Sequence, residues 1–238
     1  MHQPNLNKSK FNKYFIPYDI YERHRKVGEY INKNDTVLDV GGELNHLSQF
    51  CLPKKIVVAN LTSGDVVIKK DKLPFKNNSF SCVCAIDVLE HIPTQKRQQF
   101  IENLIMVASS KVILSFPMGT TKHESYEKET LNWLIKKKQN VAYLREHIKY
   151  ILPSIVDINS LFKGYNKEIF YSGNITINKY LFRFFMFDPK IKFLRQLIYQ
   201  FKKNLYFVTN PLLYRILSHK IFSVSINRAY IIIHKNKK

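Results

Sequence analysis

The sequence predicts a doubly wound α/β domain with a parallel sheet over its first half. Five short apolar runs lack polar alternation, which is typical of strands that are buried on both faces. A segment with helical spacing separates the fourth run from the fifth, so strands and helices alternate along the chain. A chain of 238 residues is long enough to bury one such core.

The first elements follow one another in a regular order. Residues 1–17 are expected to form an N-terminal arm, and apolar spacing predicts a helix over Asp19–Ile31. Helical spacing returns over Thr94–Val107, with Thr94 as the N-cap. The strands expected around these helices are Thr36–Val40, Lys55–Asn60, Val66–Ile68, Ser81–Ile86 and Lys111–Phe116.

The rest of the chain is expected to be mostly helical before one last strand. Asp188-Pro189 and Asn210-Pro211 should interrupt the longest helical stretch, because proline lacks an amide hydrogen. In chain order we expect one or two helices over Glu127–Lys149, a capping box at Ser154 and Asp157, a strand over Lys167–Tyr171, helix over residues 174–220 and a strand over Arg228–His234.

Charge is distributed unevenly along the chain. The formal net charge is +20, yet residues 1–119 carry 16 basic and 11 acidic side chains, whereas residues 158–238 carry 15 and 2. The same last 81 residues hold 17 of the 32 aromatic side chains. A hydrophobic content of 45% excludes an intrinsically disordered chain. The sequence therefore has a near-neutral front part and a basic, aromatic rear part.

The cysteines and the apolar runs predict where the protein resides. Three cysteines, with no CxxC pair, are too few for a disulfide framework or a zinc cage, so we expect reduced thiols in a core. The first 20 residues lack an apolar segment of the secretory type, and no apolar run reaches the ~18 residues that span a bilayer. We expect a cytoplasmic protein that can lie on a membrane surface.

The most informative motif is the strand Val37-Leu38-Asp39-Val40 followed by Gly41-Gly42. Glycines after a strand let backbone amides approach a ligand closely, and a following helix N-terminus adds a favourable field for an anion. Any strand that ends in a tight turn has the same pattern. The motif alone therefore leaves a plain structural turn and a ligand-binding turn equally open.

Further motifs follow at regular distances. They are Leu73-Pro74-Phe75 with Ser79-Phe80, then Asp87-Val88-Leu89-Glu90-His91, then Ile113-Leu114-Ser115-Phe116-Pro117. Together with the glycine motif, this arrangement resembles the class I S-adenosylmethionine-dependent methyltransferases, in particular their type 11-like branch. The resemblance covers about residues 20 to 155 and the last strand. It implies a Rossmann-like sheet of seven strands, the last antiparallel, with a helical insert before that strand.

The resemblance also implies a set of cofactor-binding residues. Asp39, Gly41 and Gly42 match the motif that holds the methionine end of S-adenosylmethionine. Asn60 stands where the family usually has an acidic residue for the ribose hydroxyls, and an amide loses the charge-assisted part of that bond. The remaining expected contacts to the adenine and the methyl-donor end are Asp71, Ile86 and Asp87.

Two departures from the family pattern keep a second interpretation open. Glu43-Leu44-Asn45 replaces the further glycines, and Ser81 replaces the usual aspartate after Ser79-Phe80. These differences leave room for a relative that keeps the fold as a binding module without catalysis. The catalytic interpretation is the one that we prefer.

Candidate catalytic residues lie beyond the expected carboxyl ends of the fourth and fifth strands. They are Glu90, His91 and His123, which have the proton-transferring groups that a hydroxyl or protonated amine acceptor would require. For His91 a capping or packing role in its turn is the stronger alternative. Glu146 and His147 are expected on a solvated or rim face of a helix, without a catalytic role.

A metal site receives little support from the sequence. Asp87, Glu90 and His91 have the spacing of ligands on one helical turn, and the resemblance extends to some methyltransferases that use such an acid–acid–histidine cluster. No later histidine is clearly placed to complete the set. We therefore assign no metal ligands from the sequence.

The rear part, residues 174–222, is expected to be a basic, aromatic insert between the core of residues 18–173 and the final strand and tail of residues 223–238. Three roles are open for it: a cap near an anionic membrane, plain packing on the core, and nucleic-acid binding. Lysine outnumbers arginine 30 to 8 and no RNA-binding module is visible, so nucleic acid ranks last. The sequence thus predicts methyl transfer to a small-molecule or carrier- or lipid-linked acceptor, with a binding module or an RNA methyltransferase as alternatives.

Overall fold

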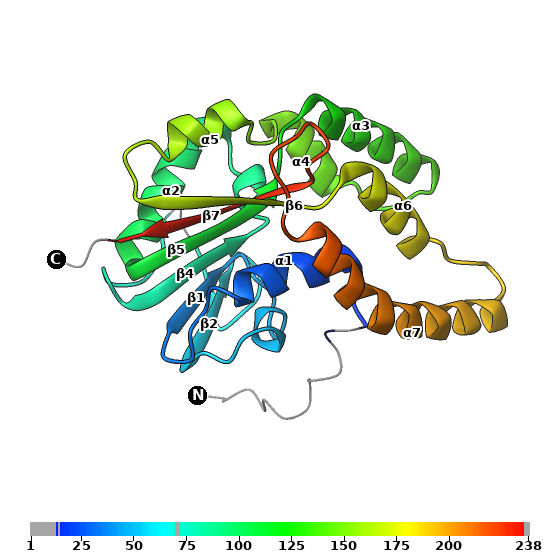
Figure 1. Ribbon diagram of the computed structural model, residues 1–238, viewed down its shortest axis with the longest axis horizontal. Coiled ribbons are helices and arrows are strands. Elements are labelled where there is room, and N and C mark those ends of the chain that lie inside the picture. Colours follow the sequence, from blue (N-terminus) through cyan, green and yellow to red (C-terminus); the bar gives the residue numbers. More distant parts are fainter. Residues whose placement is uncertain (1–12, 14, 70–71, 236–238) are drawn as a thin grey trace.

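The computed structural model describes residues 13, 15–69 and 72–235, and its centre is one seven-stranded sheet. The strand order is β3-β2-β1-β4-β5-β7-β6, and β7 is antiparallel to both of its neighbours (Figure 1). The strands are β1 (Thr36–Val40), β2 (Lys55–Asn60), β3 (Val66–Val67), β4 (Phe80–Ile86), β5 (Ala108–Pro117), β6 (Lys167–Ser172) and β7 (Arg228–His234). The predicted fold, with its antiparallel last strand, is confirmed.

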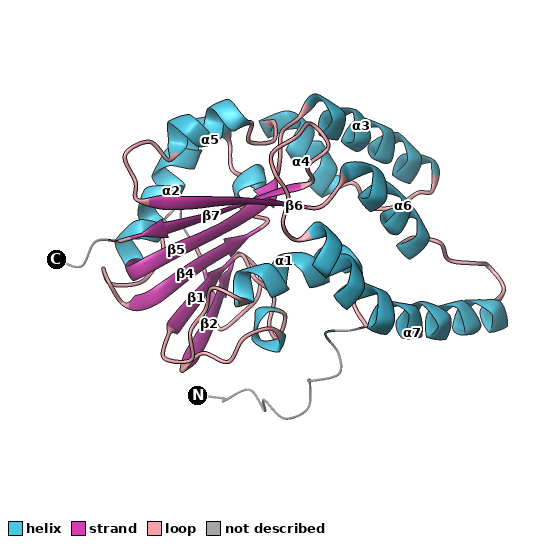
Figure 2. Ribbon diagram, in the orientation of Figure 1, coloured by secondary structure: helices cyan, strands magenta, loops and turns pink. Residues whose placement is uncertain are grey.

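Helices cover both faces of this sheet (Figure 2). On one face, apolar side chains of α2 and α5 pack against the strands, and on the other face Val27 of α1 packs with Leu47. The three cysteines are buried and free in that second cluster, as expected. The helices are α1 (Tyr18–Gly28), α2 (Arg97–Val107), α3 (Thr121–Lys136), α4 (Ala142–Tyr150), α5 (Ile155–Leu161), α6 (Ile175–Phe185) and α7 (Lys192–Leu217), with short 3-10 turns η3 (Leu47–Gln49), η4 (Leu89–His91) and η5 (Thr94–Lys96).

The strand order reverses between β1 and β4, which both pair in parallel with their neighbours. In an open α/β sheet, ligands bind beyond the carboxyl ends of the strands at such a reversal. The glycines after β1 and the motif after β4 therefore meet at one edge of the sheet. Topology alone brings together the segments that the sequence analysis selected.

Two local predictions are wrong. Thr94 does not cap the second helix: its hydroxyl donates to the carbonyl of Tyr150, and α2 begins only at Arg97. Pro211 does not interrupt α7, which continues through it to Leu217. Asn210, just before the proline, is fully buried and its amide donates to the Ile16 carbonyl at 2.8 Å, so this packing holds the helix together across the proline.

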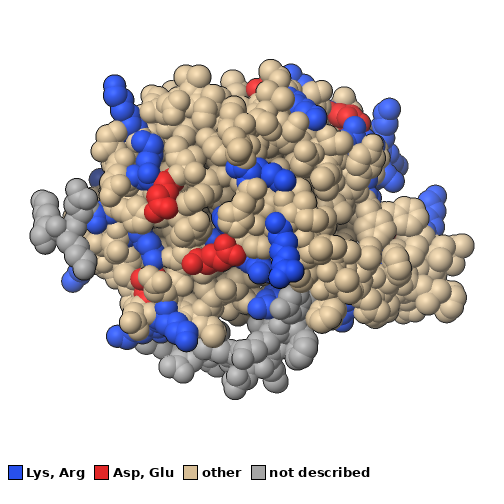
Figure 3. All heavy atoms as spheres, in the orientation of Figure 1, with Lys and Arg blue, Asp and Glu red and all other residues tan. Residues whose placement is uncertain are grey.

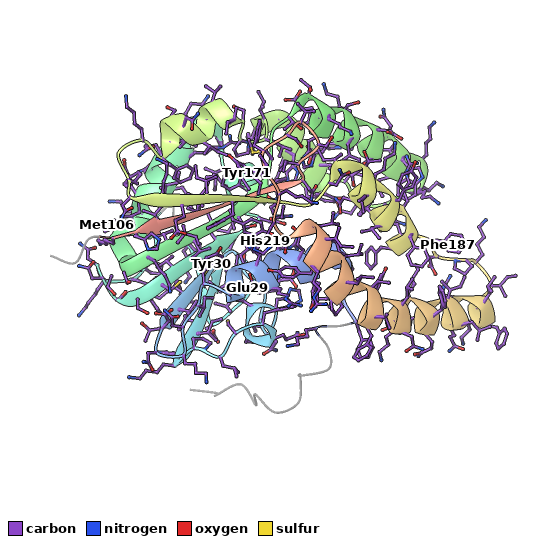
Figure 4. All side chains as sticks on the ribbon, viewed as in Figure 1. Glu29, Tyr30, Met106, Tyr171, Phe187 and His219 are labelled. Atoms are coloured by element: carbon purple, nitrogen blue, oxygen red, sulfur yellow. The ribbon has the colours of Figure 1, made fainter. Side chains whose placement is uncertain are left out.

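The insert is a helical hairpin with two different ends. The C-terminal half of α7 packs on α1, where Tyr18 and Tyr21 meet Tyr214 and Leu217. Glu29, Tyr30 and His219 gather near this junction (Figure 4). The N-terminal half of α7 extends away from the body (Figure 1), and there Phe193, Tyr199 and Phe201 are 58–70% exposed. The aromatic side chains in the N-terminal half of α7 therefore do not all pack on the core, so plain packing does not account for this half of the helix.

Within the described residues, no helix is both long enough and apolar enough to cross a membrane. The expected N-terminal arm lies almost entirely outside the described residues.

Candidate functional site

The turn after β1 is built so that only glycine fits well. Gly41 has a φ of +78°, and a Cβ atom there would lie 2.4 Å from Cγ2 of Val88. Its amide donates to the carbonyl of Ala59 at 2.7 Å, which fixes the turn against β2. A Cβ on Gly42 would lie 2.1 Å from the carboxylate of Asp39. Glycine is therefore required at both positions, because Val88 and Asp39 leave no room for a Cβ atom. A plain structural turn accounts for this packing as well as a cofactor-binding turn does.

Asp39 is the feature that a plain turn does not explain. Its side chain is fully buried, and neither carboxylate oxygen has a hydrogen-bond partner among the residues that the structure describes. Burial raises the pKa of Asp39 to about 7. Native proteins seldom bury a carboxyl group without partners, because such burial is costly. The described residues therefore leave this carboxyl group without the polar partner that buried acids usually have.

Asn60 serves the same turn in a way that the resemblance does not predict. Its amide nitrogen donates to the carbonyls of Gly42 and Gly41 at 2.9 and 3.3 Å, and its oxygen accepts from the Leu61 amide at 2.6 Å. In this conformation the side chain holds the glycine turn in place. Contact with a ribose would require Asn60 to exchange at least one of these bonds.

Asp87 stands directly after β4 with a φ of +55° and is held by two arginines. Arg23 of α1 and Arg228 of β7 both donate to its carboxylate, and Asp19 lies 3.0 Å from Arg23 and 3.5 Å from Arg228. Burial alone would raise the pKa of Asp87, but Arg228 and Arg23 outweigh it and lower the pKa to about 2. Asp87 therefore remains a charged anchor between three elements, and its carboxylate is engaged within the protein.

The turn η4 brings Glu90 and His91 to the same edge. Glu90 is buried, and its Oε2 atom has no hydrogen-bond partner in the described part of the chain. Burial first, and then the nearby Asp87, raise the pKa of Glu90. The Nδ1 atom of His91 lies 2.7 Å from the carboxylate of Glu146 on α4. The capping role considered for His91 is thus replaced by a contact with a side chain 55 residues later.

A second histidine completes this group. His147 is buried, and its Nε2 atom lies 3.4 Å from Nε2 of His91 while its Nδ1 atom lies 2.7 Å from Glu127 on α3. The expected solvated position of His147 is therefore wrong, although Glu146 is half exposed as expected. The spacing of α4 explains the error, because neighbouring positions on a helix face different directions.

His123 lies near this group through Glu127, the residue that also contacts His147. It follows the N-cap Thr120 of α3, and its Nε2 atom lies 4.0 Å from the carboxylate of Glu127. Burial, with a contribution from Arg228, lowers the pKa of His123 to about 3, so its ring is neutral at physiological pH. The structure thus brings the three candidate catalytic residues, Glu90, His91 and His123, into one neighbourhood.

The other predicted site residues have different outcomes. Ile86 is the buried last residue of β4 and packs in the core cluster on the α1 side of the sheet. Asp71 lies outside the described residues. The sequence analysis missed Arg23, Arg228, Glu127 and the role of His147. Of these, only Arg228 had a visible signal, since it is a charged residue at the start of an otherwise apolar strand.

Comparisons with solved structures identify the fold. A S-adenosylmethionine-dependent methyltransferase from Archaeoglobus fulgidus is 13% identical, with a TM-score of 0.50 over 94% of this chain and 97% of that chain. A methyltransferase from Thermotoga maritima, described as a possible histamine N-methyltransferase, is 10% identical with a TM-score of 0.56 over 95% and 93%.

A third similar structure is phosphoethanolamine N-methyltransferase 2 of Haemonchus contortus. It is 18% identical with a TM-score of 0.50, and the match covers 88% of this chain and 51% of that chain. No protein-family model and no curated protein matches the chain. Sheet order, antiparallel last strand and these likenesses agree, and the chain has the class I S-adenosylmethionine-dependent methyltransferase fold.

Proposed function

We propose that the protein transfers a methyl group from S-adenosylmethionine to an acceptor at an anionic membrane surface. The observation that carries the cofactor assignment is the buried, partnerless carboxylate of Asp39 beside the close-packed glycines. When bound, the cofactor supplies a methyl group on a sulfonium, which is already activated for displacement. Asp39, Gly41 and Gly42 would hold its methionine end, and Asn60 would keep the turn in shape.

The acceptor side of the proposal rests on η4 and the helices α3 and α4. A methyl transfer is favoured mainly by aligning the acceptor, which can contribute ~7–11 kcal/mol. Glu90 and His91 lie next to Asp87 at the end of β4, so they would meet an acceptor brought to the cofactor. The Nε2 atom of His91 would then accept a proton from a hydroxyl or an amine, whereas His123, whose pKa is lowered to about 3, is too weak a base for this step.

Calorimetry with S-adenosylmethionine and S-adenosylhomocysteine tests the cofactor assignment. We expect Gly41→Ala to abolish binding, because the added methyl would push Val88 and the turn apart. Gly164→Ala is a matched control: Gly164 has a similar φ of +80°, but nothing lies within 4 Å of its Cβ position. Failure of both ligands to bind the parent protein at millimolar concentration would favour the non-catalytic binding module.

The membrane assignment rests on α7 and the loop before it. The helix contains five basic residues and no acidic residue. Lys202 is largely buried, and its ammonium donates to the carbonyls of Phe185 and Phe187, which ties the end of α6 to α7. Phe187 lies in the loop between the helices (Figure 4) and is half exposed. The lysine therefore holds the hairpin rigid while its aromatic tip remains outside.

The exposed end of this hairpin combines apolar and basic side chains. Residues other than Lys, Arg, Asp and Glu cover most of the protruding arm in Figure 3, with blue Lys or Arg side chains at its margin. The exposed members are Phe187, Ile191, Phe193, Leu194, Leu197, Tyr199 and Phe201, flanked by Lys190, Lys192 and Arg195. Seven large apolar side chains are thus exposed within fifteen residues, which is a composition that marks interaction sites in globular proteins. Anionic lipid complements both halves of the pattern, since aromatic side chains enter the interface and basic ones contact the headgroups.

Vesicle sedimentation tests this assignment. We expect binding to vesicles of phosphatidylcholine with phosphatidylglycerol, and weaker binding to phosphatidylcholine alone. Each basic residue near the surface contributes about 1 kcal/mol, so replacing Lys190, Lys192 and Arg195 with alanine should weaken binding by roughly 100-fold. The triple alanine variant of Lys136, Lys137 and Lys138 removes the same charge from the exposed end of α3 and should change binding much less.

Two outcomes would contradict the membrane assignment. In the first, both triple variants lose vesicle binding equally, which would mean that net charge alone is responsible. In the second, the protein binds RNA with a steep salt dependence but does not bind anionic vesicles. That result would favour the RNA methyltransferase alternative.

A further inference from the structure

Three potential metal ligands converge between η4 and α4. One ligand atom each from Glu90, His91 and His147 lies within 4.8 Å of the others. The two histidine Nε2 atoms are 3.4 Å apart. Tetrahedral zinc with bonds of 2.0–2.1 Å to nitrogen separates its ligands by about 3.3 Å. The histidine pair therefore already has the spacing of two ligands on one ion.

Two carboxylates determine which ring nitrogen is free on each histidine. Nδ1 of His91 lies 2.7 Å from Glu146, and Nδ1 of His147 lies 2.7 Å from Glu127. An ionised carboxylate only accepts hydrogen bonds, so each Nδ1 carries the hydrogen. In the neutral rings both Nε2 atoms then present lone pairs toward each other. This arrangement is repulsive without a cation, and carboxylates behind histidines are the usual outer shell of a metal site.

Glu90 supplies an independent indication. Its side chain is 1% exposed, and its Oε2 atom has no hydrogen-bond partner among the described residues. A buried carboxylate oxygen without a partner is rare in native proteins. The same oxygen-bearing group takes part in the three-residue cluster. An ion coordinated by the two histidines would provide the missing partner.

We propose that Glu90, His91 and His147 bind one divalent transition-metal ion, with Zn²⁺ as the preferred ion. Two imidazoles and one carboxylate form a ligand set of catalytic zinc sites, whereas Mg²⁺ prefers oxygen ligands. Asp87 is not a ligand, because its carboxylate is held by Arg23 and Arg228. The side chain of His91 is 30% exposed, which leaves one side of the ion open.

The open side would admit an oxygen or nitrogen atom of the methyl acceptor, and this part of the inference rests on the proposed function. With its Nε2 atom bound to the ion, His91 could no longer accept the proton of the acceptor. A metal-bound hydroxyl would instead release its proton to solvent water on the open side, more easily than a free hydroxyl does. The site would therefore select acceptors that carry a metal-binding oxygen close to the atom that is methylated. Metal binding itself is independent of methyl transfer and can be tested without a substrate.

Isothermal titration of chelator-treated protein with Zn²⁺, together with visible absorption after Co²⁺ addition, tests the site. We expect one equivalent of metal and the intense Co²⁺ bands of tetrahedral coordination. His91→Ala and Glu90→Gln should weaken binding by at least about 100-fold, and Glu127→Gln should weaken it by roughly 10–100-fold through loss of the outer shell. His91→Ala is the most informative variant, since this partly exposed residue is the least needed for folding.

His234→Ala is the matched control, because His234 also pairs with a carboxylate, at 2.6 Å from Glu168, but lies at the far end of β7. Its metal affinity should equal that of the parent protein. Absence of Zn²⁺ and Co²⁺ binding at about 100 µM, which would place the dissociation constant above ~10⁻⁴ M, would overturn the proposal and leave a proton shared by the two rings. Unchanged affinity in His91→Ala would overturn it as well. In either case S-adenosylmethionine binding by the same sample still decides the proposed function separately.

Discussion

Asp39→Asn is expected to make the ligand-free protein more stable relative to the parent protein as the pH rises from 5 to 7. The same variant is expected to bind the cofactor more weakly. The pKa of Asp39 is raised from 3.8 to about 7, so between these values the folded protein holds a proton that the unfolded chain has lost. The free energy of unfolding of the parent protein should therefore fall by up to about 1.4 kcal/mol per pH unit over this window. The amide does not ionise, so the variant lacks this contribution.

Urea unfolding at pH 5, 6, 7 and 8 measures the effect. The difference between the variant and the parent protein should grow in favour of the variant up to pH 7 and then level off. Asp188→Asn is a suitable control, since this carboxylate is exposed on the arm and pairs with Arg195. A difference between Asp39→Asn and the parent that does not change with pH would contradict the assigned pKa.

Asp39→Asn should weaken cofactor binding, although it removes a cost to the stability of the ligand-free protein. A positively charged group of the cofactor beside Asp39 favours the ionised carboxylate, so binding at pH 6 should release a proton from it. Calorimetry in buffers of different ionisation enthalpy should detect this proton in the parent protein and not in Asp39→Asn. The variant should also bind at least about tenfold more weakly, since a charge-assisted contact contributes about 1.5–3 kcal/mol. Equal affinity would remove Asp39 from the cofactor site.

The sequence was sufficient for the elements whose signal is local. Buried parallel strands require continuous apolar runs, so β1, β2 and β4 were predicted close to their observed bounds. The capping box of Ser154 and Asp157 depends on residues three apart, and it is present at the start of α5. The glycine turn was also found, because the conformation of Gly41 limits which residue can stand there.

The acceptor side of the site could not be predicted because its contacts join distant parts of the chain. His91 meets His147 across 56 residues, and Arg228 meets Asp87 across 141. No period or spacing encodes such a pair; it exists only once the sheet order is fixed. The continuation of α7 through Pro211 has the same origin, since Asn210 is held by the distant Ile16. Local propensity was overridden there by tertiary packing.

Arg228→Met is expected to cause the largest loss of stability among substitutions near the site. Arg228 is buried, with a side chain only 5% exposed, and it contacts both Asp87 and Asp19. Its removal takes the more buried partner from Asp87 and leaves this carboxylate with Arg23 alone, and losing one partner of a buried ion pair costs about 3–5 kcal/mol. Arg23→Met should cost less, because Arg23 is 21% exposed and Arg228 would still neutralise Asp87. Arg215→Met, on the exposed face of α7, should change stability by no more than about 0.5 kcal/mol.

A double-mutant cycle separates the charge effect from loss of packing. Asp87→Asn combined with Arg228→Met removes both charges, so the double variant should be more stable than the sum of the single losses predicts. Denaturant unfolding of the four proteins at pH 7 measures the coupling, which we expect to exceed about 1 kcal/mol. Additive losses would mean that Arg228 acts through its aliphatic part alone. Asp87 joins β4 to α1 and β7 just beside Val88 and the glycine turn. A strong coupling would therefore show that the Asp87–Arg228 ion pair stabilises the junction of β4 and β7 at this edge of the sheet.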